Sequence, residues 1–217
     1  MHTDRLSKII KRSSPDINET LIDLIRHGEP EGGSLYRGHK IDDPLSQLGW
    51  QQMRSATGEH APWNQIITSP MSRCHDFATE LGDQHNIPVT VMDNFKEVGF
   101  GNWEGKTREQ LKAERLQEYE AFYRDPVSNR PERAEALQDF IQRVTDTYQS
   151  VIENFSGQHL LIVAHAGVIR AIIAHTLLSP PHGMYRIQVD NAGISRISHK
   201  EDKGILLKHN VTMDEFQ

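Results

Sequence analysis

Short apolar runs alternate with amphipathic segments along most of this chain. Runs with the length and composition of buried strands lie at 21–25, 65–69, 87–92 and 159–164. Segments whose apolar residues recur at helical spacing lie at 47–58, 71–84, 134–155 and 168–178. Strands that alternate with helices form mostly parallel sheets with both faces covered. The pattern therefore predicts a three-layer α/β/α fold in which the strongly apolar run 159–164 is a central parallel strand.

The remaining segments complete one predicted domain that spans the whole chain, 1–217. Residues 1–20 are polar and are expected to form an N-terminal extension before the first strand. We interpret 104–155, which is helical in pattern and rich in charge, as a helical insertion that covers the pocket. Closing strands are predicted at 184–189, 194–198 and 205–207, and the last residues are expected to fray.

Composition narrows the functional class. The chain has 217 residues, 36% of them hydrophobic and 25% charged, with a formal net charge of −6. This acidic balance disfavours nucleic acid as a partner, because binding to phosphate backbones needs a basic face. Cys74 is the only cysteine, so no intramolecular disulfide is possible and the reducing cytoplasm fits. Without an apolar stretch long enough for a signal or a membrane span, we expect a cytoplasmic protein with no membrane partner, either monomer or homodimer.

Charged side chains and histidines gather where the predicted strands end. Arg26 and His27 follow the first strand, and Gly28 is expected to let the backbone turn sharply there. Arg73 lies in the first turn of the helix after the second strand, and His165 follows the central strand. Ligands of open α/β sheets bind at the carboxyl ends of the strands, where arginines suit a phosphoryl group. A neutral imidazole is a possible nucleophile for such a group.

The glycine- and aromatic-rich loop at 96–105 adds candidate proton donors to this set. Glu97 is the first candidate, because a carboxylic acid beside a phosphoryl group can protonate the leaving oxygen. Glu104 lies on the same loop and is the alternative. The sequence alone leaves the choice between these two carboxyl groups open.

Four motifs in order resemble the histidine phosphatase superfamily, also called phosphoglycerate-mutase-like. They lie at 24–29, 69–73, 96–105 and 163–170, and the resemblance runs from about residue 21 to residue 198. It implies that His27 is the phosphorylated nucleophile and that His165 is the second histidine of the phosphate pocket. It further implies Arg26 and Arg73 as phosphate ligands, Glu97 as the proton donor, and neither a metal nor a cofactor.

The segment after the first motif departs from the superfamily pattern. Many relatives have Thr or Ser where this chain has Pro30, and an Asn that touches phosphate where it has Gly33. Ser34 is therefore a candidate to supply the missing phosphate contact. Arg37 is a candidate substrate-binding residue, with a loop ion pair as an equal alternative.

These residues favour a phosphomonoester hydrolase that acts on a small phosphorylated metabolite. Segments 36–39 and 73–78 are most similar to the α-ribazole phosphatase branch, which acts late in cobalamin assembly, so α-ribazole 5′-phosphate is the expected substrate. One alternative is a phosphoglycerate mutase, although such mutases usually carry a longer insertion and closing tail. The other is a non-catalytic protein that binds phosphorylated ligands, which would need the arginines but no proton donor.

Overall fold

The computed structural model describes residues 19–59, 61–201 and 203–216. The strands are β1 (Glu19–Arg26), β2 (Gln65–Thr68), β3 (Val89–Val91), β4 (His159–Ala164), β5 (Ile194–Lys200) and β6 (Lys203–Val211). The α-helices are α1 (Gln47–Thr57), α2 (Ser72–His85), α3 (Arg108–Glu114), α4 (Leu116–Arg124), α5 (Leu137–Asn154) and α6 (Ala166–Thr176). Short 3-10 helices lie at Asp93–Phe95, Gly101–Trp103, Pro181–Arg186 and Met213–Phe216.

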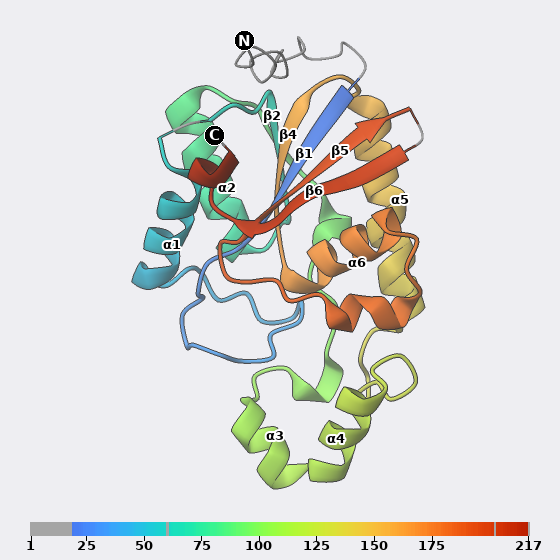
Figure 1. The fold of residues 1–217 in the computed structure, drawn as a ribbon. Helices are drawn as coiled ribbons and strands as arrows, with labels where there is room; N and C mark the ends of the chain where they lie inside the picture. The colour runs from blue at the N-terminus through green and yellow to red at the C-terminus, as the bar shows by residue number, and fades with distance from the viewer. Residues whose placement is uncertain (1–18, 60, 202, 217) are drawn as a thin grey trace, which may run out of the picture.

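One six-stranded sheet separates two layers of helices. Its order is β3-β2-β4-β1-β5-β6. Strands β3, β2, β4 and β1 are parallel to one another, β5 is antiparallel to β1, and β6 is antiparallel to β5. Helices α1 and α2 cover one face, and α5 and α6 cover the other (Figure 1). The predicted three-layer α/β/α fold with a central β4 is therefore confirmed.

The central strands are buried on both faces, because successive side chains point to opposite sides. Leu24 of β1 and Ile162 of β4 pack with α5 and α6, whereas Ile25 and Val163 pack with α1 and α2. All four side chains have no exposed surface. This two-sided burial explains why these strands are near-continuous apolar runs.

A close contact between two glycines fixes how the chain leaves β1. A Cβ on Gly28 would lie 2.3 Å from the carbonyl oxygen of Gly49, and a Cβ on Gly49 would lie 2.1 Å from the carbonyl oxygen of Glu29. Gly28 is not among the residues with positive φ, so a left-handed backbone conformation is not what requires glycine at this position. Glycine is needed there because the backbone passes directly against the first turn of α1.

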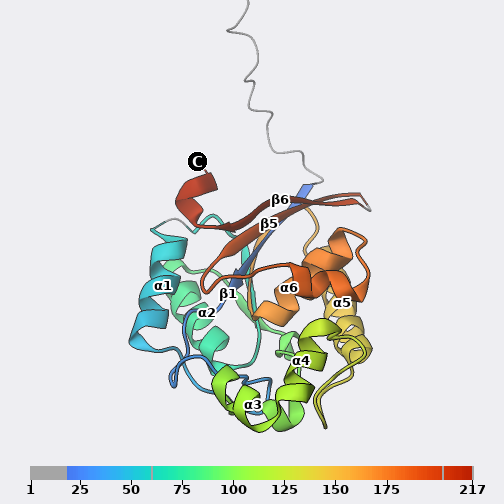
Figure 2. The same cartoon turned by 60° about the horizontal axis from the view of Figure 1, so that its bottom comes forward.

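Helix α5 belongs to the main core rather than to an insertion. Phe140, Val144 and Tyr148 are fully buried in the cluster that joins α5 and α6 to the sheet. The part of the predicted 104–155 insertion that leaves the layers is therefore the shorter α3–α4 pair, which lies beyond the carboxyl ends of the parallel strands (Figures 1 and 2). An aromatic cluster around Trp103 and Phe122 holds this pair together.

The segment after α6 differs from the prediction of a strand at 184–189. Its first part is the 3-10 helix Pro181–Arg186, which begins after Pro180 and buries Met184 against the α6 layer. Pro181 stands in the first turn of this helix, where its fixed φ favours a helical start and no backbone donor is needed. The predicted strands at 194–198 and 205–207 are present as the longer β5 and β6.

The chain end is ordered rather than frayed over Met213–Phe216. Met213 is buried in the α1–α2 core, and the guanidinium of Arg196 lies 3.7 Å from the ring centroid of Phe216. At the other end, residues 19 and 20 belong to β1, and the rest of the expected 1–20 extension lies outside the described residues. In the part of the chain that the structure describes, no helix has the length and apolarity needed to cross a membrane.

Candidate active site

The carboxyl ends of β1 and β4 bring two histidines together. The parallel register places Arg26 opposite Ala164, so the next residues, His27 and His165, are neighbours. Their ring centroids are 5.2 Å apart in an edge-to-face arrangement. The convergence expected from the two strand ends is thus present.

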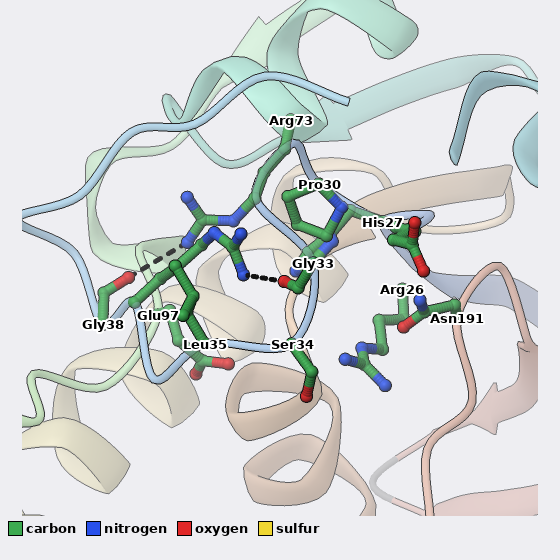
Figure 3. A pocket seen from close by; sticks show the side chains of 12 residues that line it. Arg26, His27, Pro30, Gly33, Ser34, Leu35, Gly38, Arg73, Glu97 and Asn191 are labelled. Carbon is green, nitrogen blue, oxygen red and sulfur yellow. Dashed lines mark hydrogen bonds between the residues drawn. The ribbon is translucent and has the colours of Figure 1, made fainter. Parts of the chain in front are cut away.

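A cavity of about 330 Å³ opens beside His27 (Figure 3). Its lining comes from the end of β1, the following loop, the start of α2 and two further loops: Arg26, His27, Glu29, Pro30, Gly33, Ser34, Leu35, Arg37, Gly38, Arg73, Glu97 and Asn191. All the site residues expected from the sequence line this cavity, except His165. That histidine is fully buried behind the ring of His27.

His27 has a defined tautomer. Its Nδ1 lies 2.7 Å from the carbonyl oxygen of Gly28, which can only accept, so Nδ1 carries the hydrogen and Nε2 keeps its lone pair. Burial lowers the pKa of His27 well below 6.5, and the charges of Arg73 and Arg26 lower it further. The side chain is therefore a neutral imidazole with a free ring nitrogen.

Arg26 and Arg73 surround this imidazole with positive charge. Arg73 is 1% exposed and donates to the carbonyl oxygens of Gly38 and Ile41, each at 3.0 Å. Arg26 donates to the carbonyl oxygen of Val189 at 2.7 Å. Within residues 19–216 as described, the Nε atoms of both arginines are buried without a hydrogen-bond partner.

An unpaired buried donor costs about 1–3 kcal/mol, and more when it is charged. An anion in the cavity would lie beside the guanidinium groups of Arg26 and Arg73 and would neutralise the local charge. The planar guanidinium geometry fits carboxylate and phosphate oxygens. The pocket is therefore suited to a phosphoryl group next to Nε2 of His27.

His165 is held by a residue that sequence reasoning did not select. Its Nε2 lies 2.7 Å from Oγ of Ser69, which follows β2 at the same edge of the sheet. Burial, followed by the charge of Arg73 and the proximity of His27, lowers the pKa of His165 well below 6.5. The position of Ser69 at a strand end was the available signal for its involvement.

Glu97, and not Glu104, presents its carboxylate to the cavity. Its Oε2 accepts from the backbone N–H of Gly167 at 3.1 Å, in the first turn of α6, and Oε1 accepts from Val98 at 2.9 Å. A Cβ on Gly167 would lie 2.2 Å from Oε1, so glycine is needed for this contact. Glu104 instead accepts from the backbone N–H groups of Phe100 and Lys40.

Arg37 serves the loop rather than an open ligand site. Its Nε pairs with Asp43 at 2.7 Å, and its terminal nitrogens donate to the carbonyl oxygens of Gly33 and Glu31. Of the two alternatives for Arg37, the structure shows the loop ion pair, which with the two carbonyl contacts takes three of its five N–H donors. Arg37 also lines the cavity, and its substrate contact stays a prediction. Ser34 does line the cavity, next to Gly33.

Asn191 also lines the pocket, and no sequence pattern pointed to it. It lies beside Arg26 (Figure 3) on the loop before β5. This loop is joined to the end of β1, because Ala192 N donates to Arg26 O at 3.0 Å and Arg26 N donates to Gly193 O at 3.3 Å. The antiparallel return of β5 alongside β1 is what brings Asn191 to the site.

No group of three or more histidine, cysteine, aspartate and glutamate side chains among the described residues is arranged to hold a metal ion. The donors that face the pocket are imidazole, guanidinium and amide groups. Their chemistry suits an oxyanion.

Comparison with known proteins identifies the class. Residues 22–212 match the model of the histidine phosphatase superfamily (branch 1), and the chain belongs to this family. It is 31% identical over 179 residues to an adenosylcobalamin/alpha-ribazole phosphatase of Salmonella typhimurium, with 80% of this chain and 88% of that protein covered. The protein is therefore a phosphatase.

Solved structures share the fold over most of its length. The alpha-ribazole phosphatase from Shigella flexneri superposes with a TM-score of 0.76 at 26% identity, with 88% of this chain and 96% of that one covered. A mycobacterial glucosyl-3-phosphoglycerate phosphatase complexed with VO3 gives a TM-score of 0.78 at 25% identity, with 88% of this chain and 99% of that one covered. The fold is thus shared by phosphatases named for different substrates.

The lowered pKa of His27 makes a direct prediction for its titration. In long-range ¹H–¹⁵N spectra, we expect His27 to remain the neutral Nδ1–H tautomer at pH 6.5, where an ordinary histidine is half protonated. Protonation should require a lower pH, because burial and two arginines disfavour the cation. The urea-unfolded chain provides the reference titration. Half-protonation of His27 at or above pH 6.5 would contradict the proposed environment.

Proposed function

We propose that this phosphatase hydrolyses small phosphomonoesters through a phosphoryl group carried on Nε2 of His27. The observation that carries the proposal is the tautomer of His27. Its hydrogen lies on Nδ1, so the lone pair of Nε2 is available beside two arginines with unpartnered Nε groups. A neutral nucleophile in a cationic pocket can approach an anionic phosphorus centre.

In the first step, Nε2 of His27 forms a bond to phosphorus as the bond from phosphorus to the ester oxygen breaks. Glu97, acting as a carboxylic acid, gives its proton to that oxygen, and the alcohol leaves. In the second step, water attacks phosphorus, the phosphorus–nitrogen bond breaks, and Glu97 takes back a proton. Inorganic phosphate is released and His27 regains its lone pair.

Arg26 and Arg73, which line the cavity, are proposed to bind the oxygens of the transferred group. We assign His165 as a further donor to this group, because it contacts the ring of His27 and is uncharged. Preorganised donors of this kind stabilise the charge that develops in the transition state. Arg37 acts as a positioning residue that keeps the loop around Gly33 and Ser34 in place.

For the substrate, we propose α-ribazole 5′-phosphate. Support comes from the similarity to a relative named for that activity, at 31% identity. A solved relative is named for glucosyl-3-phosphoglycerate instead, which makes that compound the natural comparison. Both are phosphomonoesters of polar alcohols.

The role of His27 is tested by substitution. We expect His27→Ala to reduce the hydrolysis of p-nitrophenyl phosphate to less than about one thousandth of wild type, because the nucleophile is lost. Wild-type enzyme quenched during turnover of ³²P-labelled substrate should carry acid-labile label on His27. His75→Ala, on the outer side of α2, serves as the control and should remain active. An active His27→Ala variant would refute the mechanism.

The role of Glu97 is tested against Glu104. Glu97→Gln should lower kcat for glycerol 1-phosphate by about 10²–10⁴-fold, since a poor leaving group needs the proton. The loss should be smaller for p-nitrophenyl phosphate, whose leaving group is stable as an anion. Glu104→Gln, the matched variant on the same loop, should leave kcat close to wild type. The reverse pattern would make Glu104 the acid.

The proposed substrate is tested by steady-state kinetics on a small panel. We expect kcat/KM for α-ribazole 5′-phosphate to exceed the values for glucosyl-3-phosphoglycerate and p-nitrophenyl phosphate. Release of inorganic phosphate is the measurement. A higher kcat/KM for glucosyl-3-phosphoglycerate would refute α-ribazole 5′-phosphate as the preferred substrate, but it would not contradict the phosphohistidine mechanism.

A further inference from the structure

A second cavity of about 30 Å³ shares Glu97 with the phosphate pocket. Besides Glu97, its wall includes Phe100, Arg170 and Tyr185. The carboxyl group assigned to protonate the leaving oxygen thus faces both spaces. An alcohol that leaves the phosphate pocket past Glu97 would contact the residues that line this second cavity.

The hydroxyl group of Tyr185 has a hydrogen to donate. Arg130 donates from a terminal nitrogen to the Tyr185 oxygen at 2.8 Å, and a guanidinium cannot accept. The Tyr185 oxygen therefore accepts this bond and keeps its own hydrogen free. Among the hydrogen bonds of the described residues, none has Tyr185 as donor. Tyr185 lines the cavity, and its hydroxyl hydrogen is not taken up by a protein acceptor among the described residues.

Arg130 is well fixed behind Tyr185. It also donates to the carbonyl oxygen of Gly99 at 3.2 Å, and its guanidinium carbon lies 5.6 Å from the ring centroid of Phe100 and 5.8 Å from that of Phe122. These contacts orient the tyrosine oxygen without taking its hydrogen. The arrangement is that of a positioned donor.

Arg170 brings a second donor to the same cavity. Its Nε donates to the carbonyl oxygen of Ile187 at 2.8 Å, and no bond from its terminal nitrogens to a protein acceptor occurs in the described part of the chain. It lies one turn after Gly167 on α6, so both residues are on one face of the helix. Its charge acts on both Arg26 and Tyr185, which places it near the two sites.

We propose that this cavity, which has room for about one water-sized group, receives an oxygen substituent next to the ester carbon of the alcohol part, and that Tyr185 and Arg170 donate to it. The inference rests on the proposed function, since it takes Glu97 as the group at the leaving oxygen. It specifies the substrate class as phosphate esters of alcohols that carry an oxygen atom next to the ester carbon, such as the ring oxygen of a ribose 5′-phosphate, a hydroxyl or a carboxylate. A plain alkyl group would leave both donors without an acceptor, which costs binding energy.

Three esters of equal chain length test the subsite: propyl phosphate, glycerol 1-phosphate and 3-phosphoglycerate. Wild-type kcat/KM should be higher for the two oxygen-bearing esters than for propyl phosphate. Tyr185→Phe should lower kcat/KM for glycerol 1-phosphate by about two- to tenfold, the value of one hydrogen bond, and leave propyl phosphate unchanged. Arg170→Gln should affect 3-phosphoglycerate more than glycerol 1-phosphate, because a carboxylate binds a guanidinium more strongly.

Tyr123→Phe is the matched control. Tyr123 is an exposed tyrosine of α4 whose hydroxyl lies 2.5 Å from that of Tyr36, outside the cavity, so its loss should change none of the three values. Equal losses on all three esters in Tyr185→Phe, or no preference in wild type, would overturn the subsite. Phosphohistidine trapping distinguishes failure of the subsite from failure of the proposed function. If His27 is labelled but the three esters are hydrolysed equally well, only the subsite is refuted. If the esters are hydrolysed and His27 carries no label, the proposed function is refuted.

Discussion

The parallel pairing of β1 with β4 is the constraint on which the whole site depends. With Arg26 opposite Ala164, the residues that follow, His27 and His165, meet at 5.2 Å. A slip of one residue would turn every side chain of a strand to the other face and separate the two rings. Both strands are buried on both faces, so the apolar core makes such a slip costly. The register that stabilises the fold therefore also sets the geometry of the site.

Positive charge in a buried place is expensive, and the fold limits this cost in two ways. Terminal nitrogens of Arg26 and Arg73 donate to backbone carbonyl oxygens of two loops, at Val189 in one and at Gly38 and Ile41 in the other. The neighbouring imidazoles stay neutral, since burial and the arginines lower the pKa of both. The two unpartnered Nε groups remain as an uncompensated cost. An anion in the cavity would offset the charge of both guanidinium groups, so the cost of burying this charge and the preference for an anionic ligand have one physical origin.

The sequence predicted the parts of the site that are local to strand ends. Arg26, His27, Arg73 and His165 each follow an apolar run, so the edge of the sheet at which they lie can be inferred from the runs themselves. Glu97 and Glu104 could not be separated, because the choice depends on which one reaches the first turn of α6, a contact 70 residues away in the chain.

Two differences between prediction and structure also come from contacts between distant parts of the chain. The amphipathic pattern of α5 does not reveal which core the helix joins. The apolar residues of 184–189 suggest a strand, but this segment begins within a 3-10 helix that follows Pro180. The position of Asn191 at the pocket follows from the antiparallel pairing of β5 with β1. The position of Tyr185 at the second cavity follows from a 3-10 helix, which apolar periodicity did not reveal.

Helix α6 connects the proposed chemistry with the proposed selectivity. Its first turn holds the Glu97 carboxylate through Gly167, and its next turn carries Arg170 to the second cavity. Because three residues make nearly one helical turn, the acid and the alcohol-binding donor are fixed relative to each other by a single element. Tyr185 and Arg130, by contrast, come from segments outside the sheet layers. The proposed selectivity thus depends on segments other than the strand ends that carry Arg26, His27 and His165.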